Sequence, residues 1–387
     1  MVLMPSFEES LQEVDAHIEA NPDDASAWNT KGVLLAKMES FGNALRSFDR
    51  AIRLNPDLTE AHVNRGRVLL ALSPDKAHEA LKSLDHALRI EPENGMALFD
   101  KASALRALGR TNEELACYKT LVKLNLSEWR IWMRMGDITL EAGQFGSAVD
   151  NYDKALQLDP NLVPALVHRA IALSMMEKWK EAIKSVQAAT KRAPDDIETW
   201  KILGDVNLRA GKYKSAVKAL KKAAQIDPHD ASIENTLGMV SYRSGNTRDA
   251  IRHFKRATIR KKDHLSAWRN LGFMNMELED WEEASAAWNR VTSLSKRDPD
   301  IFDAQAVTYA RLGDFCSAFD AWDRARKLYR KQGNDKEVER VRNLGRAARI
   351  NCARQKKTAK AQREKEKSAR RFDDQLGARR RKQKGSR

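Results

Sequence analysis

Apolar and polar positions along this chain repeat with a period of 34 residues. Within each period, apolar residues recur three and four positions apart in two successive runs, which is the spacing of one face of an α-helix. A period that holds two such runs indicates a hairpin of two amphipathic helices. The periods begin at Ala25, Thr59, Gly95, Trp129, Val163, Ile197, Ala231, Leu265 and Pro299. The pattern therefore predicts nine helical hairpins over residues 25–332.

Small residues stand at fixed places in each period. The eighth position is Gly or Ala in all nine periods, and the twentieth is Ala in eight of them, with Glu114 as the exception. Small residues allow two helices to approach closely, and large residues fill the neighbouring holes. The twenty-fourth position supplies large residues, among them Phe48, Tyr152 and Trp288. This arrangement predicts one packing scheme that recurs along the chain.

The boundaries between periods differ in two ways. The second period is two residues longer than the others, and the extra residues fit a turn around Pro74. A proline closes five periods, whereas Leu126, Lys262, Lys296 and Arg330 take its place in the other four. Because proline stops a helix, we expect straighter or longer helices at those four boundaries.

These residues resemble the signature of the tetratricopeptide repeat family, which is Trp, then Leu-Gly, then Tyr, followed by Ala, Phe, Ala and Pro. The first repeat carries Trp28, Gly32, Ala44, Phe48, Ala51 and Pro56. The resemblance spans about four-fifths of the chain. It implies an all-α fold, a right-handed superhelical solenoid of antiparallel helical hairpins.

Both ends of the repeat array carry helical signals. In residues 1–24, Ser6 and Glu9 form a predicted capping box before an apolar stripe. Residues 333–352 carry a second stripe that starts near Asp335, and we expect both helices to cap the array. The C-terminal helix could instead fold into the groove of the later repeats. Residues 353–387 are predicted to be a basic tail, either partly disordered or a charged helix.

The positive charge is concentrated in the last part of the chain. The whole sequence carries a formal charge of +15, of which residues 333–387 contribute +13. Contact with phosphate backbones, an acidic protein or an anionic membrane surface is therefore a question about this tail. The candidate contacts are Lys356, Lys357, Arg370, Arg371, Arg379, Arg380, Arg381 and Lys382. The alternative is a solubilising segment without a ligand.

The sequence offers no constellation typical of an enzyme. Its eight histidines lack metal-ligand spacing, so we expect no metal and no cofactor. Three cysteines are too few for a disulfide framework, and Cys117 and Cys316 are interpreted as small packing residues. No apolar stretch approaches the length of a membrane span, and no secretory signal is visible. We expect a cytoplasmic, non-catalytic protein.

The resemblance also implies where a partner binds, because the first helices of tetratricopeptide repeats line the concave face of the superhelix. Methionine and aromatic side chains there suit an amphipathic helix or an extended peptide. The alternative is that these side chains pack on the adjacent repeat. The candidate groove residues are Phe99, Arg130, Met133, Arg134, Asn235, Met239, Tyr242, Asn270, Phe273 and Met276.

One specific mode of binding in this family is not expected here. Members that bind the tails of heat-shock chaperones use a clamp of Lys, Asn and Arg at fixed groove positions. In this chain Arg130 and Arg134 form the only suitable basic pair. The preceding repeats offer Asp100 in place of Asn, and Val63 with Arg67 in place of Lys and Asn. We therefore expect no heat-shock chaperone carboxylate clamp.

The sequence as a whole favours a scaffold or adaptor that binds a protein partner in its groove. The alternative is a nucleic-acid- or ribosome-associated factor that docks through its basic tail while the repeats recruit a protein. A third, weaker hypothesis is a regulatory subunit of an enzyme on another chain. Salt separates the first two, because binding by tail cations falls steeply with ionic strength whereas apolar anchoring does not.

Overall fold

The computed structural model describes the backbone of residues 6–384 and the side chains of residues 6–369. Over this range the regular elements are twenty α-helices and one short 3₁₀ helix, η1 (Pro74–Lys76). The α-helices are α1 (Phe7–Ala20), α2 (Ala25–Lys37), α3 (Phe41–Leu54), α4 (Thr59–Leu72), α5 (Ala77–Ile90), α6 (Gly95–Ala107), α7 (Thr111–Lys123), α8 (Trp129–Glu141), α9 (Phe145–Leu158), α10 (Val163–Met175), α11 (Trp179–Arg192), α12 (Ile197–Arg209), α13 (Tyr213–Ile226), α14 (Ala231–Arg243), α15 (Thr247–Arg260), α16 (Leu265–Glu277), α17 (Trp281–Leu294), α18 (Pro299–Arg311), α19 (Phe315–Lys331) and α20 (Asp335–Lys384).

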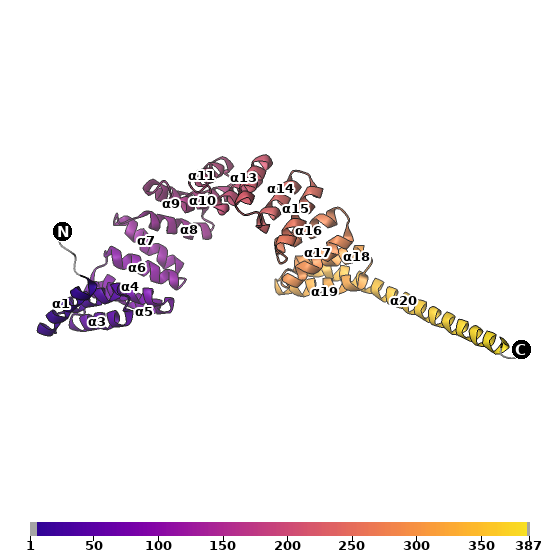
Figure 1. The fold of residues 1–387 in the computed structure, drawn as a ribbon, viewed down its shortest axis with the longest axis horizontal. Coiled ribbons are helices and arrows are strands. Elements are labelled where there is room, and N and C mark those ends of the chain that lie inside the picture. Colours follow the sequence, from indigo (N-terminus) through magenta and orange to yellow (C-terminus); the bar gives the residue numbers. More distant parts are fainter. Residues whose placement is uncertain (1–5, 385–387) are drawn as a thin grey trace. The chain divides into compact units, whose positions relative to one another are not determined.

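The helices form two compact units, one with α1–α11 and one with α12–α20. Within each unit, every helix packs on the helix that follows it in the chain (Figure 1). Several first helices of successive hairpins also touch, namely α2 with α4, α4 with α6, α8 with α10, and α12 with α14. Each unit is therefore an all-α solenoid in which the first helices form one layer.

The hairpins follow the sequence period. Among the described residues, α2 to α19 pair as nine hairpins, and the first helix of each begins at the residue where a period begins. Of the two extra residues of the second period, one lengthens α4 to 14 residues, against 13 in the other first helices, and one lengthens the connection to α5, which contains η1. Because equivalent residues occupy the same helical position in every hairpin, the same packing scheme recurs in all nine hairpins.

The small and large positions of each hairpin meet directly. A Cβ atom on Gly136 of α8 would lie 2.4 Å from Cε1 of Tyr152 in α9, and one on Gly272 would lie 2.7 Å from Cε2 of Trp288. Tyr152 and Trp288 are fully buried. Glycine at these positions therefore lets the large side chain rest against the backbone of the first helix.

The expectation for repeats without a closing proline is wrong at α7. This helix has 13 residues, whereas the other second helices up to α17 have 14, and only α19, with 17 residues, is longer. Asn125 adopts a left-handed conformation (φ 58°) just beyond α7, and this conformation ends the helix early. Asparagine tolerates such a conformation better than most residues.

The end helices are held to the hairpins by caps and apolar contacts. The predicted capping box of α1 is confirmed, because Ser6 and Glu9 each accept a hydrogen bond from the other's backbone N–H. At the other end, Val338, Val341 and Ala348 of α20 are buried in the cluster that α19 shares with α18. The N-terminal part of α20 therefore packs on the last hairpin, which α18 and α19 form.

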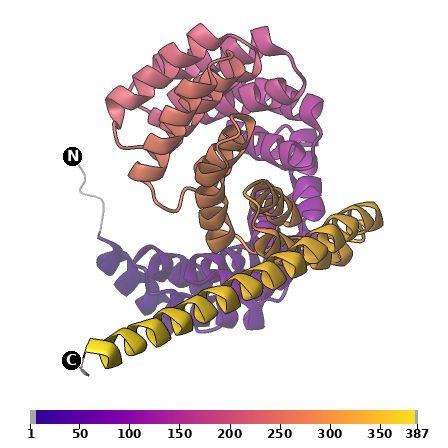
Figure 2. The same cartoon turned by 90° about the vertical axis from the view of Figure 1, so that its right-hand side faces the viewer.

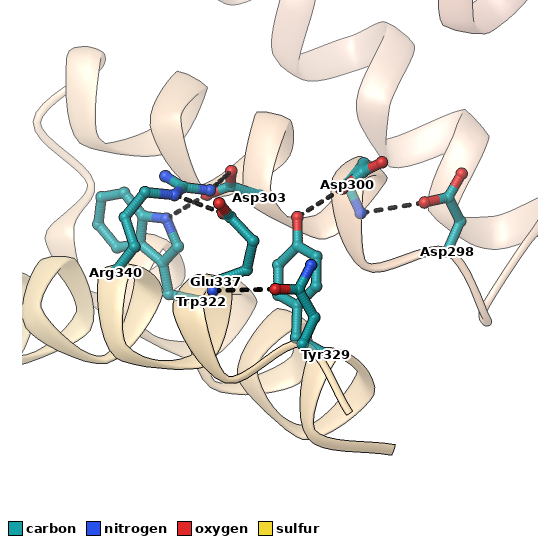
Figure 3. A network of polar contacts seen from close by, with 8 residues as sticks. Asp298, Asp300, Asp303, Trp322, Tyr329, Glu337 and Arg340 are labelled. Carbon is teal, nitrogen blue, oxygen red and sulfur yellow. Dashed lines mark hydrogen bonds and ion pairs between the residues drawn. The ribbon is translucent and has the colours of Figure 1, made fainter. Parts of the chain in front are cut away.

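Polar contacts reinforce this C-terminal cap (Figure 3). Asp303 of α18 accepts hydrogen bonds from Nε1 of Trp322 at 2.8 Å and from Arg340 of α20. Arg340 also pairs with Glu337, at 2.6 Å between Nε and Oε2. The Tyr329 hydroxyl donates to Asp300. Three helices are thus joined around the buried side chains of Trp322 and Tyr329.

The interpretation of Cys316 as a packing residue alone is wrong. Cys316 of α19 and Cys352 of α20 form a disulfide, with Cα atoms 4.8 Å apart and 36 residues of sequence separation. The two cysteines meet because α19 and α20 lie side by side, and no short motif in the sequence records that contact. Cys117 is a buried free thiol, as the packing interpretation requires.

Beyond the disulfide, α20 continues without a break to Lys384 and projects away from α19 (Figures 1 and 2). Side chains from Ala353 to Ala369 are exposed on all sides. No helix in residues 6–384 is both long and apolar enough to cross a membrane.

Candidate protein-binding groove

A pocket opens between the N-terminal ends of α6 and α8. Its volume is about 760 Å³, which is within the range of small-molecule and side-chain pockets. The lining residues are Asn94, Gly95, Met96, Phe99, Leu121, Leu126, Glu128, Arg130 and Ile131. Two of the groove candidates from the sequence, Phe99 and Arg130, therefore lie on one pocket.

The unusual boundary after α7 shapes this pocket. Because Asn125 turns the chain early, Leu126 folds back over the start of α6, where a Cβ on Gly95 would lie 2.6 Å from its Cδ1. Glycine at the first position of α6 leaves room for that side chain. Leu126 stands where five other repeats carry proline, so the pocket follows from a local departure in sequence.

The pocket has an apolar floor and a small polar rim. Met96, Phe99 and Leu126 expose 55%, 39% and 49% of their surface although all three are large and apolar. On the rim, Glu128 accepts a hydrogen bond from Arg130 at 3.3 Å, and the Arg130 guanidinium lies over the Trp129 ring. The rim charges neutralise each other, so the apolar floor dominates the chemistry of the pocket.

Arg134, another groove candidate, makes a buried ion pair with Glu114. Its guanidinium donates two hydrogen bonds to the Glu114 carboxylate, at 2.8 and 3.0 Å, and Glu114 is fully buried. These hydrogen bonds raise the pKa of Arg134. Burial, with the adjacent carboxylate, raises the pKa of Tyr118 to about 12. Glu114 stands at the twentieth position of repeat three, where the other repeats carry alanine. Its ion pair with Arg134 links repeats three and four.

We expect Arg134→Ala to lower the free energy of unfolding by about 2 kcal/mol, because it removes two charge-assisted hydrogen bonds from a buried carboxylate. Urea titration measures the loss. The double variant Glu114→Ala/Arg134→Ala is the control, since it restores alanine at the repeat's small position and leaves no buried charge. A double variant less stable than Arg134→Ala would show that the pair is not the cause.

Two side chains at positions compared with the family's carboxylate clamp pair with each other. Arg67 of α4 contacts Asp100 of α6, with 2.8 Å between Nη2 and Oδ2. Burial raises the pKa of Asp100, and Arg67 acts in the opposite direction. Nearby, Asn64 donates a hydrogen bond to Asn29 at 3.1 Å. These polar groups link successive first helices.

The candidates in the second unit mostly contact one another or the hairpin cores. Asn270 donates a hydrogen bond to Asn235 at 3.0 Å. Met239 and Tyr242 are partly buried against the cluster around Phe254. These contacts are those of repeat packing, although the side chains lie on first helices.

Phe273 and Met276 both contact Trp288 of α17. The Phe273 ring meets Trp288 edge to face at 4.9 Å between centroids and stays 40% exposed. The Trp288 indole N–H donates to the Met276 sulfur at 3.2 Å. Of this group, Phe273 offers the most surface to a partner.

The remaining candidate residues are Met133, which packs in the hairpin core, and the basic residues of the C-terminal tail. Met133 of α8 is partly buried against the cluster around Tyr152. In the tail, Lys356 and Lys357 are exposed on α20. The side chains of the other tail candidates lie outside the described residues, namely Arg370, Arg371, Arg379, Arg380, Arg381 and Lys382.

Seven of the nine pocket residues were missed by sequence reasoning, among them Met96, Leu126 and Glu128. Met96 lies on α6, a first helix, and the resemblance assigns first helices to the groove. The absence of proline at 126 was the other available signal. The sequence did not predict the left-handed conformation of Asn125, which brings Leu126 over Gly95.

Within the described side chains, no group of three or more His, Cys, Asp or Glu residues is placed to hold a metal ion. The polar clusters there are pairs and caps of the repeats.

Known repeat families match much of this chain. Tetratricopeptide repeat profiles match residues 25–58, 115–162 and 139–205. The profile of the cytochrome c-type biogenesis protein H TPR domain matches residues 185–301.

Human relatives are similar over a short segment. Superkiller complex protein 3 is 23% identical over 104 residues, and tetratricopeptide repeat protein 13 is 27% identical over 104 residues. Each match covers 27% of this chain but only 7% and 12% of the two relatives.

Among solved structures, yeast Tom70 has a TM-score of 0.52 and 12% identity, covering 89% of this chain and 92% of that one. The Cut9 and Hcn1 hetero-tetramer of the APC/C gives a TM-score of 0.46 at 18% identity, covering 82% and 76%. The likeness to Tom70 is one of fold.

Stacked antiparallel helical hairpins with interlocking small and large positions define a helical-repeat protein of the α-solenoid class. This chain belongs to the tetratricopeptide repeat family. Such repeats support a role as a scaffold for protein interactions.

Proposed function

We propose that this protein is a non-catalytic scaffold or adaptor that binds a peptide or amphipathic helix on the first helices of its repeats. The observation that carries the proposal is the apolar pocket between α6 and α8. Met96, Phe99 and Leu126 stay exposed there, and an exposed apolar cluster on a repeat surface is typical of a binding site. The partner is a protein segment that inserts one large apolar side chain.

The chemistry of the pocket specifies that side chain. Its floor is apolar, and its rim pair of Glu128 and Arg130 is already neutralised. A charged side chain entering the pocket would lose hydration without gaining a free counter-charge. Burying a Leu, Phe or Trp side chain there contributes about 1.5–3 kcal/mol, so this contact is a plausible anchor for a peptide.

The paired clamp positions support the same proposal. Arg67 contacts Asp100, and Arg134 contacts the buried Glu114. A carboxylate-terminated peptide finds these cations already engaged, which supports apolar anchoring over a carboxylate clamp.

Selection of random dodecapeptides displayed on phage against the full chain tests the proposal. We expect enriched peptides to share a Leu, Phe or Trp. We expect their affinity, measured by fluorescence anisotropy, to fall at least about tenfold in Phe99→Asp, because the variant places a charge in the apolar floor. Phe99 is half-exposed, so the variant keeps the fold, and circular dichroism checks this.

Ile259→Asp is the matched control, because Ile259 is an exposed apolar residue on a second helix of the other unit. Its peptide affinity stays at the wild-type value. The proposal is contradicted if the selection yields no peptide, or if the selected peptides bind Phe99→Asp as well as the wild type.

A further inference from the structure

The long helix α20 changes its chemistry at the disulfide. Up to Cys352, one face of the helix is apolar and lies on α19 through Val341 and Ala348. Lys356 and Lys360 follow at four-residue steps and so continue the face of Cys352. The face that packs on the last hairpin therefore becomes basic where the helix leaves the hairpin.

Four cations share this continued face. Lys356, Lys360, Arg363 and Lys367 are spaced four, three and four residues apart, which places them in one row along an α-helix. We call them the basic stripe. Their side chains are exposed, and none of them forms an ion pair with another described residue. By contrast, Arg340 and Arg342, nearer the hairpin, have carboxylate partners.

The stretch between the hairpin and the stripe also lacks acidic residues. From Arg340 to Arg363 the sequence holds nine Lys or Arg and no Asp or Glu. A further hairpin cannot dock on such a face, because burying unpaired cations is costly. The stripe therefore presents a row of exposed cations, and Glu364 and Glu366 are the only acidic residues of the sequence from 340 to 369.

We infer that the basic stripe binds the phosphate backbone of duplex nucleic acid, without reading sequence. Evenly placed, exposed cations match a polyanion whose charges recur along its length, and their binding releases condensed counterions. A bare α-helix also fits the major groove of B-form DNA, which is about 12 Å wide. The helix is exposed around its whole circumference from Ala353 to Ala369, as entry into a groove requires.

The other faces of this segment argue against a membrane as the partner. Interfacial helices pair a basic face with Trp, Phe or Leu on the opposite side. Residues 353–369 contain no large apolar residue, and the side opposite the stripe carries Ala361, Lys365 and Ala369. The segment has nothing to insert between lipid chains. The absence of aromatic residues in 353–369 likewise argues against stacking on single-stranded bases.

The test measures binding of the full chain to a DNA duplex of about 20 base pairs between about 50 and 200 mM salt. We expect Lys356→Gln/Lys360→Gln/Lys367→Gln to reduce the slope of log K against log salt by about 2.7, since each lost phosphate contact removes about 0.9. The control Arg354→Gln/Lys357→Gln/Lys365→Gln removes the same charge from other faces, and its slope stays near the wild-type value.

Phosphatidylserine vesicles form the second arm. The inference is overturned if both triple variants change the slope equally, which indicates diffuse charge, or if vesicles bind the wild type as tightly as the duplex. The inference about the basic stripe does not rest on the proposed function. We therefore expect Phe99→Asp to leave the duplex affinity unchanged. Loss of peptide binding and loss of duplex binding are thus separate outcomes.

Discussion

Replacing Trp288 with alanine is expected to lower the free energy of unfolding of the α12–α20 unit by about 3–5 kcal/mol. Trp288 is fully buried and is the largest such side chain among the described residues. It rests on the backbone of Gly272, meets Phe273 edge to face, and donates to the Met276 sulfur. Alanine leaves a cavity that these neighbours cannot close, because Gly272 has no side chain to move.

The measurement is a urea titration together with hydrogen exchange. Repeats contact their neighbours, so the loss concentrates in α16 and α17, and peptides from α2 and α3 keep their exchange rates. Ile259→Ala is the control, because Ile259 is 76% exposed and its truncation creates no cavity. Trp288→Phe introduces the residue found at the same position in α3 and α15, so we expect a smaller loss of unfolding free energy than in Trp288→Ala. A uniform rise in exchange along the chain argues against this local account.

This packing could be predicted from sequence because it repeats. Position eight is small in every hairpin and position twenty-four is large in most of them, and the contact between the two positions is a consequence of helix geometry. A pattern sampled nine times is little affected by one exception. Glu114, the exception at position twenty, was therefore visible as a departure, but its partner Arg134 lies in the next repeat and was assigned to the groove.

The pocket and the disulfide were harder to predict for a different physical reason. Each depends on a single contact that no other repeat contains. Leu126 reaches Gly95 only because Asn125 takes a left-handed conformation, and Cys316 meets Cys352 only because α20 packs on α19. Sequence signals for such contacts are single residues, whereas the fold is encoded by residues repeated at every period.

The candidate groove residues divide along the same line. Asn270 donates a hydrogen bond to Asn235, and the Met276 sulfur accepts one from the indole N–H of Trp288. Position in the repeat placed these side chains on first helices, but the identity of their neighbours decides whether they are free to bind. Phe99 differs because it stays 39% exposed on the pocket between α6 and α8.

Reduction of the Cys316–Cys352 disulfide is expected to lower the free energy of unfolding of the α18–α20 segment by about 4 kcal/mol. The bond closes a loop with a sequence separation of 36 residues, and its loss restores that much chain entropy to the unfolded segment. Urea titration with and without a phosphine reductant measures the change. Labelling of the denatured, non-reduced chain should find one free thiol, that of Cys117.

The disulfide also fixes the place where α20 leaves the hairpin. One turn beyond Cys352, the Gln355 amide donates to the Gly313 carbonyl at 2.6 Å, and after it the helix has no packing partner among the described residues. Reduction therefore loosens the base of the basic stripe and raises hydrogen exchange from Cys352 outward, while α12–α15 stay unchanged. In Cys316→Ser/Cys352→Ser the reductant has no effect, whereas Cys117→Ser keeps the full response. A reductant that destabilises the double variant equally would show that it acts elsewhere than on this bond.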